Sequence, residues 1–113
     1  VIGLNHDNTF GPVIMVGLGG IFVEVLNDVS FRACPIIKKD ALDMLKELKG
    51  YKILLDFRGS EGVDIDKLVN LLINLSNLIL KEENIFSIDF NPIFINEKGI
   101  NIADFRIIVK QNA

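Results

Sequence analysis

Residues 84–106 constrain the fold most strongly, because short β-branched runs alternate there with polar residues and are separated by a turn. On a strand, residues two apart project from the same face, so Asp89 and Asn91 point together while the apolar residues beside Asp89 point the other way. The turn formers at 96–99 predict that the chain reverses and returns as a second strand. The segment therefore predicts a β-hairpin with one polar face and one core face.

The predicted hairpin brings oxygen ligands together. Its return strand carries Asp104 back toward Asn91, and Asp89 adds a second carboxylate. Mg²⁺ prefers such hard oxygens, keeps several waters and takes its other ligands from substrate phosphates. We predict Asp89, Asn91 and Asp104 as metal ligands. The alternative for each residue alone is a local role in a turn or at a strand end, since short polar side chains usually bond nearby backbone.

Size, charge and composition narrow the class of protein. The 113 residues predict a single core, and the net charge of −3 gives no general attraction to nucleic acid. The longest apolar stretch, residues 12–26, is interrupted by glycines and does not reach the roughly 20 residues that a bilayer helix needs. Cys34 is the sole cysteine, and no signal peptide is recognisable, so we expect a cytoplasmic protein. The apolar content, half of all residues, favours a partner surface or a missing half of the protein.

The remaining segments predict an α+β fold. Two strands joined by a tight turn are expected at 13–16 and 21–26, and apolar residues of helical period predict a long helix over 64–81. Further strands are expected at 30–36, 52–55, 85–90, 92–95 and 102–109, with a helix at 41–48 capped by Asp40. This order predicts one domain with a mostly antiparallel sheet and two helices packed on one face.

The turn between the first two predicted strands contains Gly17, Gly19 and Gly20. Glycine lets backbone N–H groups approach phosphate oxygens, but the turn lacks the Lys and Ser/Thr of a P-loop, and a plain hairpin turn is the alternative. Glu24 follows on a strand-like apolar run, where an unpaired carboxylate would be costly, so we expect it to meet a cation, a donor or solvent.

Two arginines and one histidine complete the candidate residues. Arg32 and Arg58 can each hold phosphate with a planar fork of donors, or lie on the surface, or bridge Glu24. His6 precedes Asp7, a pair that allows general-base or phosphohistidine chemistry, but no nucleophile lies beside it in the sequence. We therefore favour a structural role for His6.

Taken in chain order, these segments resemble one family. The stretches are FGPVIMVGLGGIFVEVLNDVSFRACPI at 10–36, DAL at 40–42, LLDFRG at 54–59, IDFNP at 88–92 and ADFRI at 103–107. Together they resemble the carboxyl-terminal half of the ATP-grasp domain of ADP-forming (NDP-forming) acyl-CoA synthetases, the β-subunit type of acetate–CoA ligase. The resemblance implies that residues 1–113 form the second lobe of an ATP-grasp fold whose first lobe is absent from this chain.

The resemblance also implies a site and a reaction. ATP or ADP would lie between two lobes with Mg²⁺, and acyl-CoA, ADP and phosphate would interconvert with acid, CoA and ATP through a phosphohistidine relay. A CoA-binding α subunit or domain and the first lobe would be partners, the relay histidines would lie elsewhere, and the chain alone would be inactive. The implied site residues are Asp89, Asn91 and Asp104 at the metal, Glu24, Arg32 and Asp89 in catalysis, and Gly17, Gly19, Gly20 and Arg58 at the nucleotide.

The chain departs from the family at two positions. Ser87 stands where glutamate is common, and Asp56 stands where glycine is common. Two other functions stay open. One is a regulatory ATP-grasp-like region fused to a protein acetyltransferase. The other is a non-catalytic module for subunit association, for which Ser87 and Asp56 are the hints.

Overall fold

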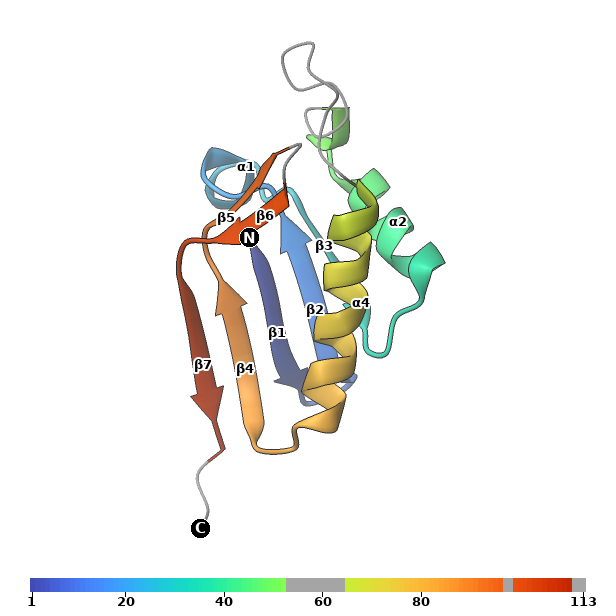
Figure 1. Cartoon of the computed structure of the whole chain (residues 1–113), viewed down its shortest axis with the longest axis vertical. Helices are drawn as coiled ribbons and strands as arrows, with labels where there is room; N and C mark the ends of the chain where they lie inside the picture. Colours follow the sequence, from blue (N-terminus) through green and yellow to red (C-terminus); the bar gives the residue numbers. More distant parts are fainter. Residues whose placement is uncertain (53–64, 97–98, 111–113) are drawn as a thin grey trace.

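The computed structural model describes residues 1–52, 65–96 and 99–110 of the chain. These residues form a five-stranded antiparallel sheet in the order β3-β2-β1-β4-β7, and a separate two-stranded ribbon of β5 and β6 (Figure 1). The elements are β1 (Ile2–Asp7), β2 (Gly11–Gly17), α1 (Ile21–Glu24), β3 (Val29–Ala33), α2 (Lys38–Glu47), α4 (Ile65–Lys81), β4 (Ile85–Phe90), β5 (Ile93–Asn96), β6 (Gly99–Ile102) and β7 (Phe105–Val109).

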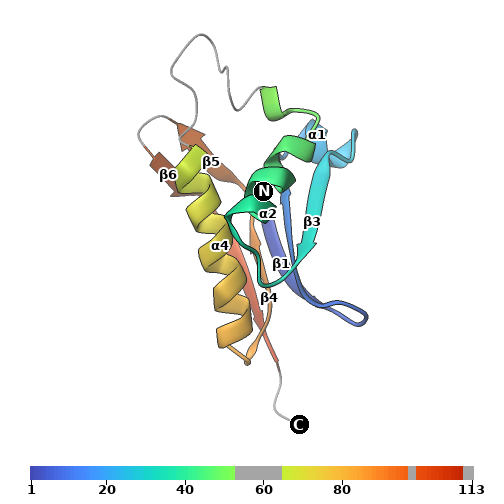
Figure 2. The same ribbon diagram turned by 90° about the vertical axis from the view of Figure 1, so that its right-hand side faces the viewer.

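Helices α2 and α4 pack on one face of the sheet and bury its apolar side chains (Figure 2). Alternate residues of each central strand point toward the helices, and the residues between them point away. On α4 the buried side chains recur with helical period, which is the pattern that predicted this helix. The core includes Ile2, Leu4, Ile14, Val16, Met44, Leu45, Leu68, Val69, Leu72, Ile79, Ile88 and Phe90. The predicted α+β fold, with two helices on one face of an antiparallel sheet, is confirmed.

The strand predicted over 21–26 is wrong. Residues 21–24 form the short helix α1, because Gly19 and Gly20 adopt φ angles of 80° and 54° and the Gly20 carbonyl accepts the N–H groups of Val23 and Glu24. The left-handed backbone favours glycine and turns the chain away from the sheet. Strand β1 pairs with β2 instead, from Ile2 opposite Val16 to Asp7 opposite Gly11.

Other boundaries differ by smaller amounts. Helix α2 begins at Lys38, so Asp40 lies inside its first turn, where the carboxylate accepts the Ile37 N–H at 2.9 Å. The strand predicted over 102–109 is divided into the end of β6 and the whole of β7. Lys52 is helical, and the rest of the strand predicted over 52–55 lies outside the described residues. No helix in the described ranges combines the length and the hydropathy that a membrane crossing requires.

Candidate functional site

Strands β4 and β7 bring the predicted metal ligands together at one end of the sheet. The Asn91 N–H donates to the Asp104 carbonyl at 3.2 Å, and the Ala103 N–H donates to the Pro92 carbonyl at 3.1 Å. These bonds close the base of the β5–β6 ribbon, whose strands pair from Ile93 opposite Ile102 onward. The predicted hairpin and the predicted return of Asp104 toward Asn91 are confirmed.

The side chain of Asp89 lies on the face of the sheet opposite the helices. Its strand neighbours Ile88 and Phe90 are buried in the core, whereas Asp89 is exposed. Phe90 is paired with Phe105 on β7, and their ring centroids are 6.4 Å apart on the helix side. The predicted division of β4 into a polar face and a core face is therefore confirmed.

A shallow groove of about 260 Å³ runs across this bare face beside Asp89. Gly3 forms part of its floor, since a Cβ placed there would lie 3.5 Å from Met15 Cε and 3.9 Å from Asp89 Oδ1. Met15 and Phe31 give one side of the groove an apolar wall, and polar groups line the other side. The complete lining is Gly3, Leu4, Asn5, Val13, Met15, Phe31, Ser87, Ile88 and Asp89. The groove therefore offers an apolar wall next to a carboxylate.

The glycine turn lies at the same end of the sheet as the β5–β6 ribbon (Figure 1). Gly17 is buried, and a Cβ there would lie 2.8 Å from Val23 Cγ2 and 3.0 Å from Val29 Cγ1. Packing alone thus explains glycine at this position, without a phosphate. Gly19 and Gly20 are the two members of the predicted set whose left-handed backbone shapes the turn itself.

The turn is anchored to the end of α2. Buried Asp28 accepts the N–H groups of Lys49 and Gly50 at 2.7 and 2.9 Å. The side chain of Leu18 occupies the space where a Cβ of Gly50 would lie. The backbone on both sides of α1 is therefore fixed against the helix layer.

The structure does not bring Arg32 to the groove. Arg32 is paired with Ile14 across β2 and β3, and Ile14 is buried under the helices, so Arg32 points to the helix side. Its guanidinium forms an ion pair with Glu47 of α2 and donates to the Phe31 carbonyl at 2.7 Å. The hydrogen bond from Arg32 lowers the pKa of Glu47. The structure therefore places Arg32 and Asp89 on opposite faces of the sheet, and the catalytic role of Arg32 stays a prediction.

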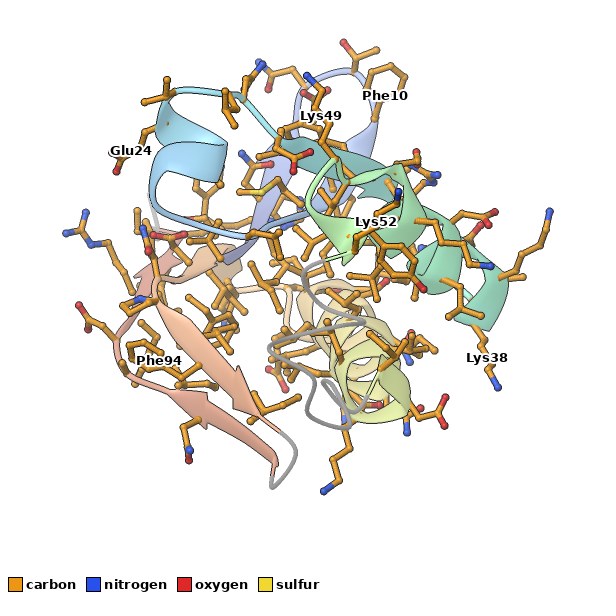
Figure 3. The ribbon with its side chains drawn as sticks, turned by 90° about the horizontal axis from the view of Figure 1, so that it is seen from above. Phe10, Glu24, Lys38, Lys49, Lys52 and Phe94 are labelled. Carbon is orange, nitrogen blue, oxygen red and sulfur yellow. The ribbon has the colours of Figure 1, made fainter. Side chains whose placement is uncertain are left out.

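Glu24 is exposed on α1, and its side chain lies at the outer edge of the molecule (Figure 3). Because α1 is a helix and not a strand of the sheet, the carboxylate of Glu24 meets solvent and needs no partner. Glu24 does lie at the same end of the molecule as the hairpin, so its predicted role stays a prediction. Arg58 and Asp56 lie outside the described residues.

Arg106 is the residue that the sequence reasoning missed. It is opposite Asp89 across β4 and β7, and residues directly opposite one another project from the same face. The only sequence signal was its place in the ADFRI stretch, two residues after Asp104. In the described ranges no group of three or more His, Cys, Asp or Glu side chains is arranged to hold a metal. The predicted ligand set combines two carboxylates with an amide, so metal binding there remains a prediction.

Comparison with known proteins gives a consistent family. Residues 1–109 match the ATP-grasp domain family. The chain is 46% identical over 109 residues to the β subunit of acetate–CoA ligase [ADP-forming] I of Pyrococcus furiosus, covering 96% of this chain and 47% of that protein. It is 48% identical over 110 residues to acetate–CoA ligase [ADP-forming] of Methanocaldococcus jannaschii, covering 96% of this chain and 16% of the relative.

Solved structures agree with this comparison. The dinucleotide forming acetyl-coenzyme A synthetase 1 of Ca. Korarchaeum cryptofilum in its apo form superposes with a TM-score of 0.91 at 47% identity, covering 96% of this chain and 52% of that chain. PH1788 of Pyrococcus horikoshii superposes with a TM-score of 0.87 at 44% identity, covering 98% and 48%. The chain thus spans about half the length of the β subunits it matches. It belongs to the ATP-grasp domain family and is similar to one stretch of the ADP-forming acetate–CoA ligases.

Proposed function

We propose that this chain is the magnesium- and nucleotide-binding part of an ADP-forming acyl-CoA synthetase. The complete enzyme would convert acyl-CoA, ADP and phosphate into free acid, CoA and ATP through a phosphohistidine relay. The observation that carries the proposal is the convergence of Asn91 and Asp104, beside Asp89, at one end of the sheet. The identity of 46% to a named acetate–CoA ligase β subunit supports the same reading.

The chemistry of the residues fits a hard divalent cation. Asp89 and Asp104 supply carboxylate oxygens and Asn91 supplies an amide oxygen, which suits Mg²⁺ when substrate phosphates complete its coordination. When bound, the metal supplies positive charge that offsets the charge on the transferred phosphoryl group. One structure of the Korarchaeum enzyme contains coenzyme A and Mg-AMPPCP, with the phosphohistidine segment pointing towards the nucleotide binding site. That enzyme shares 47% identity with this chain.

Other residues would contribute at the edges of this site. The backbone of Gly19 and Gly20 offers N–H groups to phosphate at the same end of the sheet, and exposed Glu24 follows on α1. Arg58 completes the proposed nucleotide contacts. Gly17 contributes through packing, and Arg32 acts away from the groove.

The relay histidine would come from another part of the protein. His6 lies near the far end of β1, where its Nε2 is 3.2 Å from the Ile85 carbonyl and its ring stacks on Phe86. These contacts fix His6 in the sheet, away from the Asn91–Asp104 end. We propose a first ATP-grasp lobe and a CoA-binding α subunit or domain as partners, in a cytoplasmic enzyme of which this chain is the second lobe.

Isothermal titration of Mg·ADP into the complete protein tests the proposal. The Asn91→Ala, Asp104→Ala double variant should lose magnesium-dependent binding while its circular dichroism and its unfolding midpoint stay at wild-type values. The matched control is Asn74→Ala, Glu83→Ala, which removes one amide and one carboxylate from exposed positions elsewhere. Unchanged binding by the first variant would contradict the proposal and leave the hairpin with a structural or regulatory role.

A further inference from the structure

We propose that Arg106 binds the terminal phosphate of the nucleotide beside the metal, an inference that rests on the function proposed above. The proposal depends on the pairing register of β4 and β7. Asp89 is opposite Arg106, and the register ends one pair later at Phe90 opposite Phe105. Just beyond that pair the Asn91 N–H donates to the Asp104 carbonyl at 3.2 Å. Asp89 and Arg106 thus project from one face of the strand pair. The backbone bond brings Asn91 and Asp104 to the adjoining end of the same strands, where one carboxylate oxygen of Asp104 accepts the Phe105 N–H at 2.9 Å.

Arg106 is available for a ligand, unlike the other arginine on the described strands. Arg32 is held by Glu47 and by the Phe31 carbonyl. Arg106 is exposed, and in the described part of the chain no hydrogen bond or ion pair engages its guanidinium, although a carboxylate lies directly across the strand pair. An arginine that lies near acidic residues but forms no ion pair with them can bind an anionic ligand.

The charge of the patch favours a phosphate as that anion. Two carboxylates, from Asp89 and Asp104, balance the charge of one divalent cation, which leaves the charge of a nucleotide phosphate to be met by other groups. A guanidinium neutralises phosphate charge and donates two parallel N–H hydrogen bonds in a geometry that fits phosphate oxygens. Arg106 is the basic residue among the described strands on this face, since Arg32 points to the helix side. The terminal phosphate would lie beside a metal held by these oxygens, so it is the group that Arg106 would bind.

The experiment compares ADP with AMP, because AMP lacks the terminal phosphate of ADP. Binding of each nucleotide to the complete protein is measured by titration calorimetry at saturating Mg²⁺, for wild type, Arg106→Gln and Arg106→Lys. Arg106→Gln should weaken ADP binding by roughly 10- to 100-fold, as expected for loss of a charge-assisted hydrogen bond, and AMP binding by less than about twofold. The affinity of Arg106→Lys for ADP should lie between those of wild type and Arg106→Gln, because lysine retains the positive charge but lacks the paired N–H donors of the guanidinium.

The matched control is Lys110→Gln, which removes the same charge just beyond the other end of β7, four residues away. It should bind ADP as wild type does. Equal losses for ADP and AMP in Arg106→Gln, or no loss for either, would overturn the role of Arg106 while leaving the metal site intact. Absence of magnesium-dependent ADP binding in wild type would overturn the proposed function itself, and this inference with it.

Discussion

The two faces of the sheet are made by the same strands but carry different kinds of side chain. On the helix face, Ile14 and Ile88 have 0% and 1% of their surface exposed. On the bare face, Asp89 directly follows Ile88 and is exposed, and Phe31 on β3 has 57% of its surface exposed. Alternation along a strand thus separates two tasks, because one set of residues stabilises the fold and the other is free to bind. Substitutions on the two faces should therefore have different consequences.

The largest loss of stability is expected in the helix layer. Leu72 on α4 is 0% exposed, so Leu72→Ala removes buried methyl groups and leaves a cavity. We expect the free energy of unfolding to fall by about 2–5 kcal/mol, measured by urea denaturation. Leu80→Ala, on an exposed position of the same helix, is the control and should cost less than about 1 kcal/mol. Equal losses would contradict the division into faces.

A smaller loss is expected from a buried polar contact in the same layer. The Oγ atom of Ser76, which is 0% exposed, accepts the Ile36 N–H at 3.0 Å. Ser76→Ala leaves that donor unsatisfied and should lower the free energy of unfolding by about 1–3 kcal/mol. The exposed neighbour provides the comparison, since Asn77→Ala should change stability by less than about 0.5 kcal/mol. If Ser76→Ala leaves the free energy of unfolding unchanged, water has replaced the hydroxyl as the acceptor of the Ile36 N–H.

The ion pair at the β3 edge should contribute less than about 1 kcal/mol, because both side chains are partly exposed. The pKa of Glu47 is lowered from its ordinary value of 4.5 by the hydrogen bond from Arg32. Its contribution to stability is therefore present above pH 4.5 and is lost as the pH falls through the lower folded-state pKa. The stability difference between wild type and Glu47→Gln should shrink over that acid range, as measured by urea denaturation at several pH values. A stability difference that stays constant over that range would contradict a stabilising ion pair.

The smallest effect on stability is expected on the bare face, where function should change instead. Asp89→Asn replaces an exposed carboxylate with an amide of the same shape, so we expect the free energy of unfolding to stay within about 0.5 kcal/mol of wild type. Magnesium-dependent nucleotide binding should weaken in the same variant, measured by calorimetry. A large loss of stability without a change in nucleotide binding would contradict the assignment of binding to the bare face.

The parts of the fold that were predictable are those with strong local periodicity. Helix α4 and strand β4 were found because their apolar residues recur at 3.6 and 2 residues, and the turn formers at 96–99 predicted the reversal that returns Asp104 to Asn91. Residues 21–24 have the composition of a strand, but their structure depends on the hydrogen bonds to the Gly20 carbonyl and on the left-handed glycines. The apolar composition of residues 21–24 does not indicate these hydrogen bonds or the backbone conformation of the two glycines.

The candidate site was predictable only within one hairpin. The face on which Arg32 lies depends on which strand pairs with β2 and in which register, and that information is not local. Arg106 was missed for the same reason, because its position opposite Asp89 appears only once β4 and β7 are aligned. Residues that converge through long-range pairing need the structure, whereas those joined by a short turn do not.

The anchoring of the glycine turn bears on how tightly a ligand could be held. Leu18 fills the space left by Gly50, and Asp28 binds the backbone of the same helix end, so both flanks of the turn are attached before any phosphate arrives. A preorganised set of backbone N–H groups loses little conformational entropy when it binds an anion. Under the proposed function, a side chain at Gly50 would displace Leu18 and should weaken phosphate binding at the turn from a distance.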